Sequence, residues 1–161
     1  MKFVLSDGEQ MREKLQEFPR GKLMTLSKVL VVAMNNSDIV AACGVRGMFN
    51  ILSLNVKEGY RGRGIGTQIL EKTIIAARKR NLGFITLTVF SNNIPALHLY
   101  SKYGFKEVAY VKKFRFKIMM LPLSFKAKPL CTLLHRICSK LPDTFLVHAS
   151  GWAHDLTIWE K

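Results

Sequence analysis

The chain has 161 residues, of which 48% are hydrophobic, and its 25 Lys and Arg against 11 Asp and Glu give a net charge of +14. This length and composition predict a single globular domain over residues 1–161 and exclude a small fold that needs disulfide or metal staples. The excess charge favours an acidic partner, which is a phosphate-rich cofactor, nucleic acid, anionic lipid or an acidic substrate surface.

Three features of the sequence bear on the compartment in which the protein works. Lys2 to Leu5 are followed at once by polar and acidic residues, unlike the pattern of a secretory signal. The longest apolar run, Ile118 to Phe125, contains Pro122 and is far shorter than the about 20 residues that span a bilayer. The chain has three cysteines, an odd number that does not suggest a disulfide framework and fits a reducing compartment. We therefore expect a soluble, cytoplasmic protein.

The first third of the chain predicts one helix among several strands. Phe3 to Leu5 indicates a short strand, and Ser6 or Asp7 is expected to cap a helix over about Glu9 to Phe18. Further strands are predicted at 29–34, at 39–45, and from Met48 or Phe49 to Val56.

The middle of the chain alternates helices and strands. Apolar residues recur with helical period at Ile65, Ile69, Leu70, Ile74 and Ala77. A buried strand follows at 84–89, and polar cap candidates, a proline and Gly104 delimit a short helix after Ser91. This order predicts the α+β class, with a mixed, mostly antiparallel central sheet flanked by helices.

Beyond Phe105 the chain is strongly basic, with nine Lys and Arg and one acid between residues 106 and 140. We expect one long strand from Glu107 to Met120, a last strand near Asp155 to Glu160, and an atypical insert at about 121–152 between them. Lys128 to Leu141 predicts an amphipathic helix within the insert. Its charge suits either a solvated surface or contact with a membrane surface or polyanion.

A glycine-rich turn, Tyr60 to Thr67, joins the strand ending at Val56 to the following helix. The first turn of a helix presents unpaired N–H groups and partial positive charge, and glycines let a ligand approach the backbone. Arg61 and Arg63 add charged donors. This turn predicts a phosphate or pyrophosphate site, although such loops also close ordinary turns.

Two common phosphate motifs are excluded at this turn. A P-loop places Lys-Ser or Lys-Thr after its last glycine, but Ile65 and Gly66 follow Gly64 here. The glycines at 62, 64 and 66 also lack the spacing of a dinucleotide fingerprint, and no acid occurs in the segment 78–83.

Two motifs in order resemble the GNAT superfamily of N-acetyltransferases, in particular the ribosomal-protein alanine N-acetyltransferases. The cofactor loop of that family is matched by Arg61, Gly64 and Gly66. Its second signature is matched by Asn93, Ala96, Leu99, Tyr100, Gly104 and Phe105. The resemblance extends from about Ile39 to Val108 and implies the GNAT fold, with a sheet splayed at its central strands, and acetyl-CoA as cofactor.

The resemblance also implies roles for individual residues. The pyrophosphate of acetyl-CoA is expected on the backbone of Arg61, Gly62, Arg63, Gly64, Ile65, Gly66 and Thr67. The pantetheine arm is expected along Leu54, Asn55 and Val56, with the Val56 N–H as oxyanion donor and Asn93 contacting the arm. Tyr100 matches the family's acid, and a phenol with a reference pKa near 10 is protonated at neutral pH.

The general base is not matched. The related alanine acetyltransferases carry a glutamate at the start of the central strand, where this chain has Met48 or a neighbour. Glu58 in the turn after Val56 is a candidate, and His148, His154 and Asp155 are alternatives. His98 lies two positions from Tyr100 and is expected on another helix face. A water relay or an acceptor delivered neutral would also serve.

Two cysteines and a histidine recur with helical spacing in the insert and suit either a metal site or ordinary packing. Cys131, His135 and Cys138 would line one helical face, with His148 and His154 as further ligands. Zinc sites rarely use this spacing, and cysteine is commonly buried, so packing is the preferred interpretation and no metal is predicted.

The sequence therefore predicts an enzyme that transfers an acetyl group from acetyl-CoA to a primary amine. A protein N-terminus or lysine is the first expectation for the acceptor, and a small-molecule amine the second. The alternative is a module of the same fold that binds acyl-CoA, a polyanion or a membrane surface without turnover. A homodimer through the last strand, near Trp152 and Trp159, is a further expectation, as is a location peripheral to a membrane.

Overall fold

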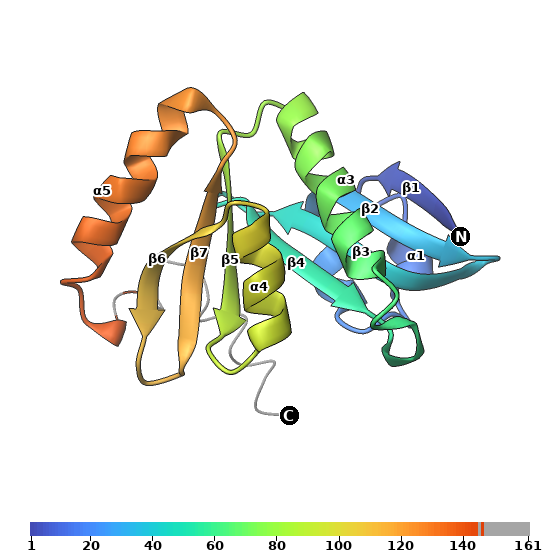
Figure 1. The fold of residues 1–161 in the computed structure, drawn as a ribbon. Helices are drawn as coiled ribbons and strands as arrows, with labels where there is room; N and C mark the ends of the chain where they lie inside the picture. The colour runs from blue at the N-terminus through green and yellow to red at the C-terminus, as the bar shows by residue number, and fades with distance from the viewer. Residues whose placement is uncertain (145, 147–161) are drawn as a thin grey trace. The chain divides into compact units, whose positions relative to one another are not determined.

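The computed structural model describes residues 1–144 and 146, and the chain divides into two compact units, Met1–Ile85 and Thr86–Lys161. Figure 1 traces the chain and labels its helices and strands. No helix in the described part of the chain is long and apolar enough to cross a bilayer.

The first unit contains an antiparallel sheet built from consecutive hairpins. Its strands are β1 (Lys2–Ser6), β2 (Ser27–Asn35), β3 (Asp38–Arg46) and β4 (Ile51–Val56), in that order across the sheet. β2 and β3 are almost entirely buried, as expected for strands covered on both faces. The register places Val56 opposite Ala41 and Leu54 opposite Cys43.

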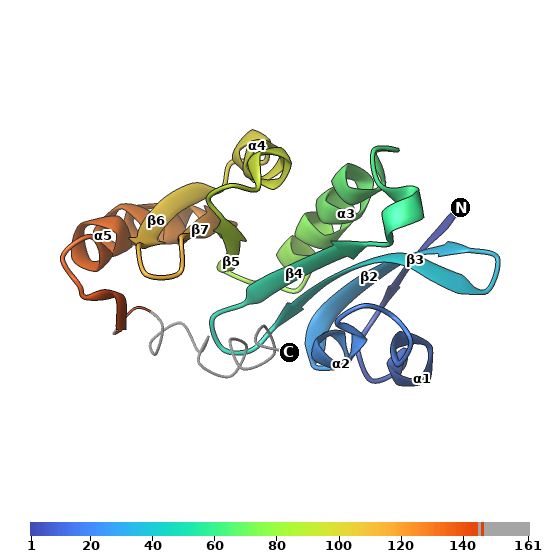
Figure 2. The ribbon, with the colours of Figure 1, turned by 90° about the horizontal axis from the view of Figure 1, so that it is seen from below.

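Helices cover both faces of this sheet (Figure 2). α3 (Ile65–Lys79) lies on one face, and the short helices α1 (Arg12–Leu15) and α2 (Gly21–Met24) lie on the other. The apolar period predicted for α3 is confirmed, because its five predicted apolar positions are all buried. The core beneath α1 and α2 is formed by Leu15, Phe18, Met24, Leu30, Val32, Met34, Ile39 and Ala42.

The prediction of one helix over Glu9 to Phe18 is wrong. Asp7 Oδ1 accepts the Gln10 N–H at 2.9 Å, so the chain first makes a turn, and α1 has only four residues. The chain then reverses: Phe18 N–H donates to the Leu15 carbonyl at 3.1 Å, and Gly21 packs directly on the Leu15 backbone. This reversal ends α1 and begins α2, which was not predicted.

The predicted start of β4, at Met48 or Phe49, is also wrong. Residues 47–50 form a turn in which Asn50 N–H donates to the Gly47 carbonyl at 3.4 Å, and both residues have positive φ. Asn50 Nδ2 also donates to the Phe84 carbonyl at 3.0 Å. The strand therefore begins at Ile51, and Met48 lies in the turn.

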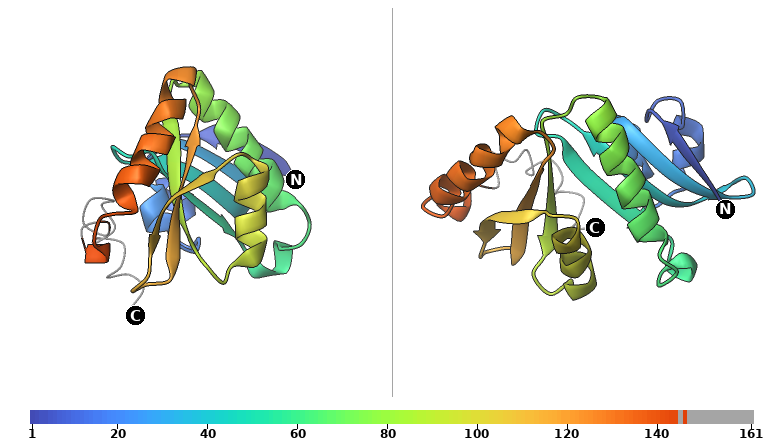
Figure 3. Two further views of the ribbon diagram at one scale, coloured as in Figure 1. Left: turned by 60° about the vertical axis from the view of Figure 1, so that its left-hand side comes forward. Right: turned by 45° about the horizontal axis from the view of Figure 1, so that its top comes forward.

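In its described residues, the second unit consists of a small sheet and the helices that accompany it. Its strands follow the order β5-β7-β6, and Figure 3 shows α5 alongside the β6–β7 hairpin. Its elements are β5 (Phe84–Phe90), which begins in the first unit, α4 (Ile94–Lys102), β6 (Lys106–Val111), β7 (Phe116–Pro122) and α5 (Lys128–Cys138).

The single strand predicted from Glu107 to Met120 is instead an antiparallel hairpin. β6 and β7 pair with Val111 opposite Phe116, and the chain turns through Arg115 at φ 54°. The amphipathic helix predicted in the insert is confirmed as α5. The predicted last strand, near Asp155 to Glu160, lies outside the described residues.

Candidate functional site

A short, well-anchored segment connects β4 to α3. Lys57 N–H donates to the Val40 carbonyl at 2.9 Å and so ends the pairing of this strand with β3. A 3₁₀ turn, η1 (Glu58–Tyr60), follows, and Gly62 and Gly64 then adopt φ values of 74° and 73°. Space around Gly62 is open, so this left-handed backbone, rather than crowding, requires glycine there.

The N-terminus of α3 offers its N–H groups to a ligand. Gln68 N–H donates the first helical bond to the Gly64 carbonyl at 3.1 Å, so the N–H groups of Ile65, Gly66 and Thr67 precede the helical ladder. The N-cap residue is Gly64, which has no side chain to cap them, and the first turn has no acidic residue. Partial positive charge therefore stays at this helix end, as an anion requires.

Two arginines extend this positive charge from positions that the fold fixes. Arg61 Nε donates to the Val56 carbonyl at 3.2 Å. The Arg63 guanidinium lies 5.6 Å from the centroid of the Tyr60 ring, and the Tyr60 hydroxyl accepts from Asn35 Nδ2 at 3.2 Å. Tyr60 and Asn35 were not predicted as site residues. An aromatic residue three positions before Arg63 is the signal that could have indicated the stacking.

The backbone N–H and carbonyl of Val56 point to the edge of β4 that faces away from β3. Successive residues of a strand direct their N–H groups to opposite edges, and Lys57 N–H points to β3. The N–H and carbonyl of Val56 therefore share the edge that Arg61 contacts. Side chains alternate as well: Asn55 Nδ2 donates to the Pro19 carbonyl at 3.2 Å, while a Cβ on Gly66 would lie 3.6 Å from Val56 Cγ2.

The candidate carboxylate and the expected base position are both exposed. Glu58 is an exposed residue of η1. Met48 has 81% of its surface accessible and lies in the turn before β4. β4 begins with Ile51 and Leu52, so the start of this strand carries no carboxylate even when it is placed at Ile51 instead of Met48.

The second motif forms α4. Asn93 is the N-cap, and its Oδ1 accepts the Ala96 N–H at 3.3 Å, while Gly104 turns the chain beyond the helix at φ 87°. Tyr100 is only 8% exposed, and its ring meets Phe105 edge-on with centroids 5.6 Å apart. His98 is exposed, which confirms that it lies on another face from Tyr100.

The predicted site residues thus form two groups, one in each unit. Val56, Glu58 and the segment 61–67 gather at the end of β4 and the start of α3. Asn93 and Tyr100 are held by α4, seven positions apart on one helix.

Cys131, His135 and Cys138 do not gather into a ligand set. Cys131 is buried, whereas His135 is exposed. Burial raises the pKa of the Cys131 and Cys138 thiols, which disfavours the thiolates that bind metal. In the part of the chain that the structure describes, no three His, Cys, Asp or Glu side chains are placed to hold a metal ion.

The fold and the loop define an α+β protein in which a glycine-rich loop and an uncapped helix terminus follow the fourth strand. A family model described as "Acetyltransferase (GNAT) family" matches residues 5–105. The chain belongs to this family, which confirms the family and fold class predicted from the sequence. Residues beyond 105, including the β6–β7 hairpin and α5, lie outside the matched range.

Individual relatives agree with this assignment. An N-alpha-acetyltransferase of Sulfurisphaera tokodaii is 38% identical over 66 residues, which are 40% of each chain. Two solved folds are similar to this chain. The acetyltransferase yncA of Salmonella typhimurium, determined with acetyl-CoA, has a TM-score of 0.60 at 17% identity and covers 77% of this chain and 94% of its own. The ribosomal-protein-S18-alanine N-acetyltransferase of Escherichia coli has a TM-score of 0.56 at 20% identity and covers 77% and 96%.

The chain spans 40% of the length of the Sulfurisphaera relative and 29% of a streptothricin acetyltransferase of Streptomyces lavendulae, to which it is 38% identical over 55 residues. The structural neighbours establish the fold, and among them are ribosomal-protein alanine N-acetyltransferases.

Proposed function

We propose that the chain is an acetyl-CoA-dependent N-acetyltransferase of class EC 2.3.1, built as one domain over residues 1–161 with an insert at about 121–152. The observation that carries the proposal is the uncapped N-terminus of α3. A pyrophosphate suits this terminus, since it accepts several backbone N–H bonds and two guanidinium contacts at once. Membership of the acetyltransferase family supplies the identity of the ligand.

The proposed cofactor site continues from the loop along β4. The backbone of residues 61–67 holds the pyrophosphate, and the pantetheine arm lies along Leu54, Asn55 and Val56. The Val56 N–H is our oxyanion donor, because it points to the edge of β4 away from β3. Asn93 contacts the arm through its amide while its Oδ1 caps α4.

In the proposed reaction the amine nitrogen attacks the thioester carbonyl carbon within a ternary complex. The C–N bond forms, the C–S bond breaks, and the thiolate of coenzyme A leaves. Tyr100 gives its phenolic proton to that thiolate, and the amine loses its proton to a base. Burial of Tyr100 supports this role, since a fixed ring orients its hydroxyl better than a mobile one.

Glu58 remains our candidate for the base. Its exposed place in η1 lets it act on an acceptor directly or through water. His148, His154 and Asp155, the alternatives from the sequence, lie outside the described residues.

The acceptor is a primary amine. A protein N-terminus or a lysine is our first candidate, since the Sulfurisphaera relative is an N-alpha-acetyltransferase, and a small-molecule amine is the second. We further propose a cytoplasmic location, an anionic partner for the basic residues of the insert, and a homodimer.

A calorimetric titration of acetyl-CoA tests the cofactor site, with ATP as a control for indiscriminate anion binding to a +14 chain. The proposal predicts that acetyl-CoA binds more tightly than ATP. The affinity for acetyl-CoA should fall about a hundredfold in Gly64→Glu, because charge repulsion and a strained φ disrupt the loop. Gly47→Glu is the matched control, because Gly47 has a φ of 68° and open space but lies in the β3–β4 turn. Equal affinity for ATP, or equal losses in both variants, would contradict the proposal.

One observation favours a second candidate, a module that binds acyl-CoA without turnover. The start of β4 carries no carboxylate, and Glu58 is exposed. Such a module would bind acetyl-CoA as tightly but release no coenzyme A when an amine is added.

A further inference from the structure

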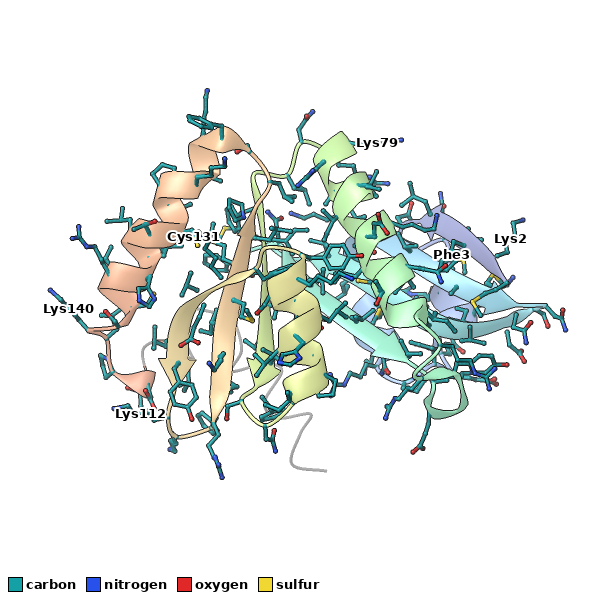
Figure 4. The ribbon with its side chains drawn as sticks, viewed as in Figure 1. Lys2, Phe3, Lys79, Lys112, Cys131 and Lys140 are labelled. Atoms are coloured by element: carbon teal, nitrogen blue, oxygen red, sulfur yellow. The ribbon has the colours of Figure 1, made fainter. Side chains whose placement is uncertain are left out.

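One side of α5 is used to build the second unit. Cys138 and Leu141 pack against the hairpin core of Ala109, Val111 and Phe116. Figure 4 shows Cys131 on the side of α5 that faces β7, whereas Lys140 points away from the sheet. The helix is therefore anchored along one face, and its other faces meet solvent.

Part of the apolar surface of this segment is not used in packing. Leu133 and Ile137, one helical turn apart, are 54% and 45% exposed. Phe125 in the 3₁₀ turn η2 (Phe125–Ala127), which leads into α5, is 84% exposed. Exposed apolar side chains are unremarkable singly, but three within one short segment indicate a contact surface.

Basic side chains flank these apolar ones. Lys126, Lys128, Arg136 and Lys140 are exposed, and the helix contains no acidic residue. The Lys128 ammonium lies 5.3 Å from the centroid of the Phe125 ring, so charge and apolar surface are adjacent. We call the seven residues the α5 surface: Phe125, Lys126, Lys128, Leu133, Arg136, Ile137 and Lys140.

We propose that the α5 surface docks this protein on an anionic lipid membrane. Lysine and arginine beside exposed Leu and Ile on α5, with exposed Phe125 in the turn before it, match a helix that lies in the membrane interface. The apolar side chains enter the acyl boundary while the cations contact lipid phosphates. A nucleic acid would satisfy the charges but leave Leu133 and Ile137 in water, and a second copy that docked through this same basic surface would bring like charges together.

Docking of this kind does not depend on acetyl transfer. It requires no membrane-spanning segment. It would confine the enzyme, and hence its amine acceptor, to the membrane surface.

Vesicle flotation tests the proposal with the full chain. The probes are vesicles of phosphatidylcholine alone and vesicles that also contain phosphatidylserine. We expect binding to the anionic vesicles that weakens with salt, and little binding to the neutral ones. The double variant Leu133→Gln, Ile137→Gln should bind at least about tenfold more weakly, since inserting one such side chain is worth about a factor of ten or more.

Matched controls separate the α5 surface from general charge and hydrophobicity. Ile75→Gln on α3 changes a residue that is 48% exposed and should leave binding intact. Arg136→Ala with Lys140→Ala should weaken binding about fivefold per residue, whereas Arg78→Ala with Lys79→Ala at the end of α3 should not.

Three results would overturn the proposal. The first is an absence of binding to anionic vesicles. The second is equal binding by the wild type and the Leu133→Gln, Ile137→Gln variant, which would leave only generic charge. The third is binding of heparin or RNA by both the wild type and this double variant, without binding to vesicles. That result would assign the basic residues to a polyanion.

Discussion

The two amphipathic helices α3 and α5 differ in how they use their apolar faces. α3 buries seven residues against the first-unit sheet: Ile65, Ile69, Leu70, Thr73, Ile74, Ala76 and Ala77. α5 buries only Cys131 fully and leaves Leu133 and Ile137 in solvent. Amphipathic periodicity alone therefore does not say how much of an apolar face enters a core.

The difference follows the limit of the family match. α3 lies within residues 5–105, where the apolar pattern serves the core and the helix terminus is the proposed cofactor site. α5 lies beyond residue 105, where part of the pattern remains at the surface. The first helix thus carries the proposed cofactor site, and the second carries the proposed membrane-docking surface.

The largest expected difference is in folding stability. Leu70→Ala on α3 should lower the free energy of unfolding by about 2–5 kcal/mol, because it removes a fully buried side chain and leaves a cavity. Leu133→Ala on α5 should change it by less than about 0.5 kcal/mol, because Leu133 is more than half exposed. Urea unfolding of both variants measures this, and equal losses would contradict the exposure of the α5 surface.

A smaller effect comes from a buried thiol of the first-unit sheet. Burial raises the pKa of Cys43 to about 12, while Thr73 contributes an opposing hydrogen bond. A group whose pKa is raised by folding stabilises the fold below its unfolded pKa, near 9, and this stability is lost as the pH rises toward 12. The free energy of unfolding should therefore fall by about 1.4 kcal/mol between pH 8 and pH 10.

The control for this effect is Cys43→Ala, which removes the titrating thiol. Denaturant unfolding at a series of pH values should give a flatter profile for this variant than for the wild type. Parallel profiles would show that lysines and tyrosines, rather than Cys43, set the alkaline limit.

The smallest expected effect on stability comes from removing the N-cap of α4. Asn93→Ala should lower the free energy of unfolding by about 1 kcal/mol, because Ala96 N–H loses its side-chain acceptor. Asn93→Ser, which can still cap, should lose much less. A thermal melt of the two variants checks the difference, and equal melting temperatures would contradict the capping role.

Where local chemistry and tertiary packing agree, the sequence predicts the structure well. The period from Ile65 to Ala77 predicted α3, and the polar residues before Pro95 predicted the cap of α4. Gly62 and Gly64 of the loop both have positive φ, a conformation that glycine adopts readily. The uncapped N–H groups at the start of α3 follow from these local features.

The errors occur where local signals were weak or tertiary contacts decided. Arg115 adopts positive φ in the β6–β7 turn, and arginine gives no signal for that conformation, so the hairpin was predicted as one strand. The reversal after α1 depends on Gly21 packing against Leu15, which the apolar spacing of the segment does not specify.

The sequence predicts the backbone groups of the candidate site better than its side-chain contacts. Backbone donors follow from the turn chemistry of residues 61–67, whatever their side chains. The stacking of Arg63 on Tyr60 and the bond from Arg61 to Val56 depend on tertiary geometry and were not predicted. The acceptor depends on surfaces built by irregular segments, for which sequence patterns carry little information.

The measurement that tests the central claim most directly is amine-dependent release of coenzyme A from acetyl-CoA. Peptides with a free N-terminus, a lysine peptide and a small primary amine are supplied in turn to the wild type and to Tyr100→Phe. We predict release with at least one acceptor class, and a loss of about a hundredfold in Tyr100→Phe with unchanged acetyl-CoA affinity. No release with any acceptor, from a chain that binds acetyl-CoA, would contradict enzymatic function, and unchanged release in Tyr100→Phe would remove Tyr100 from the mechanism.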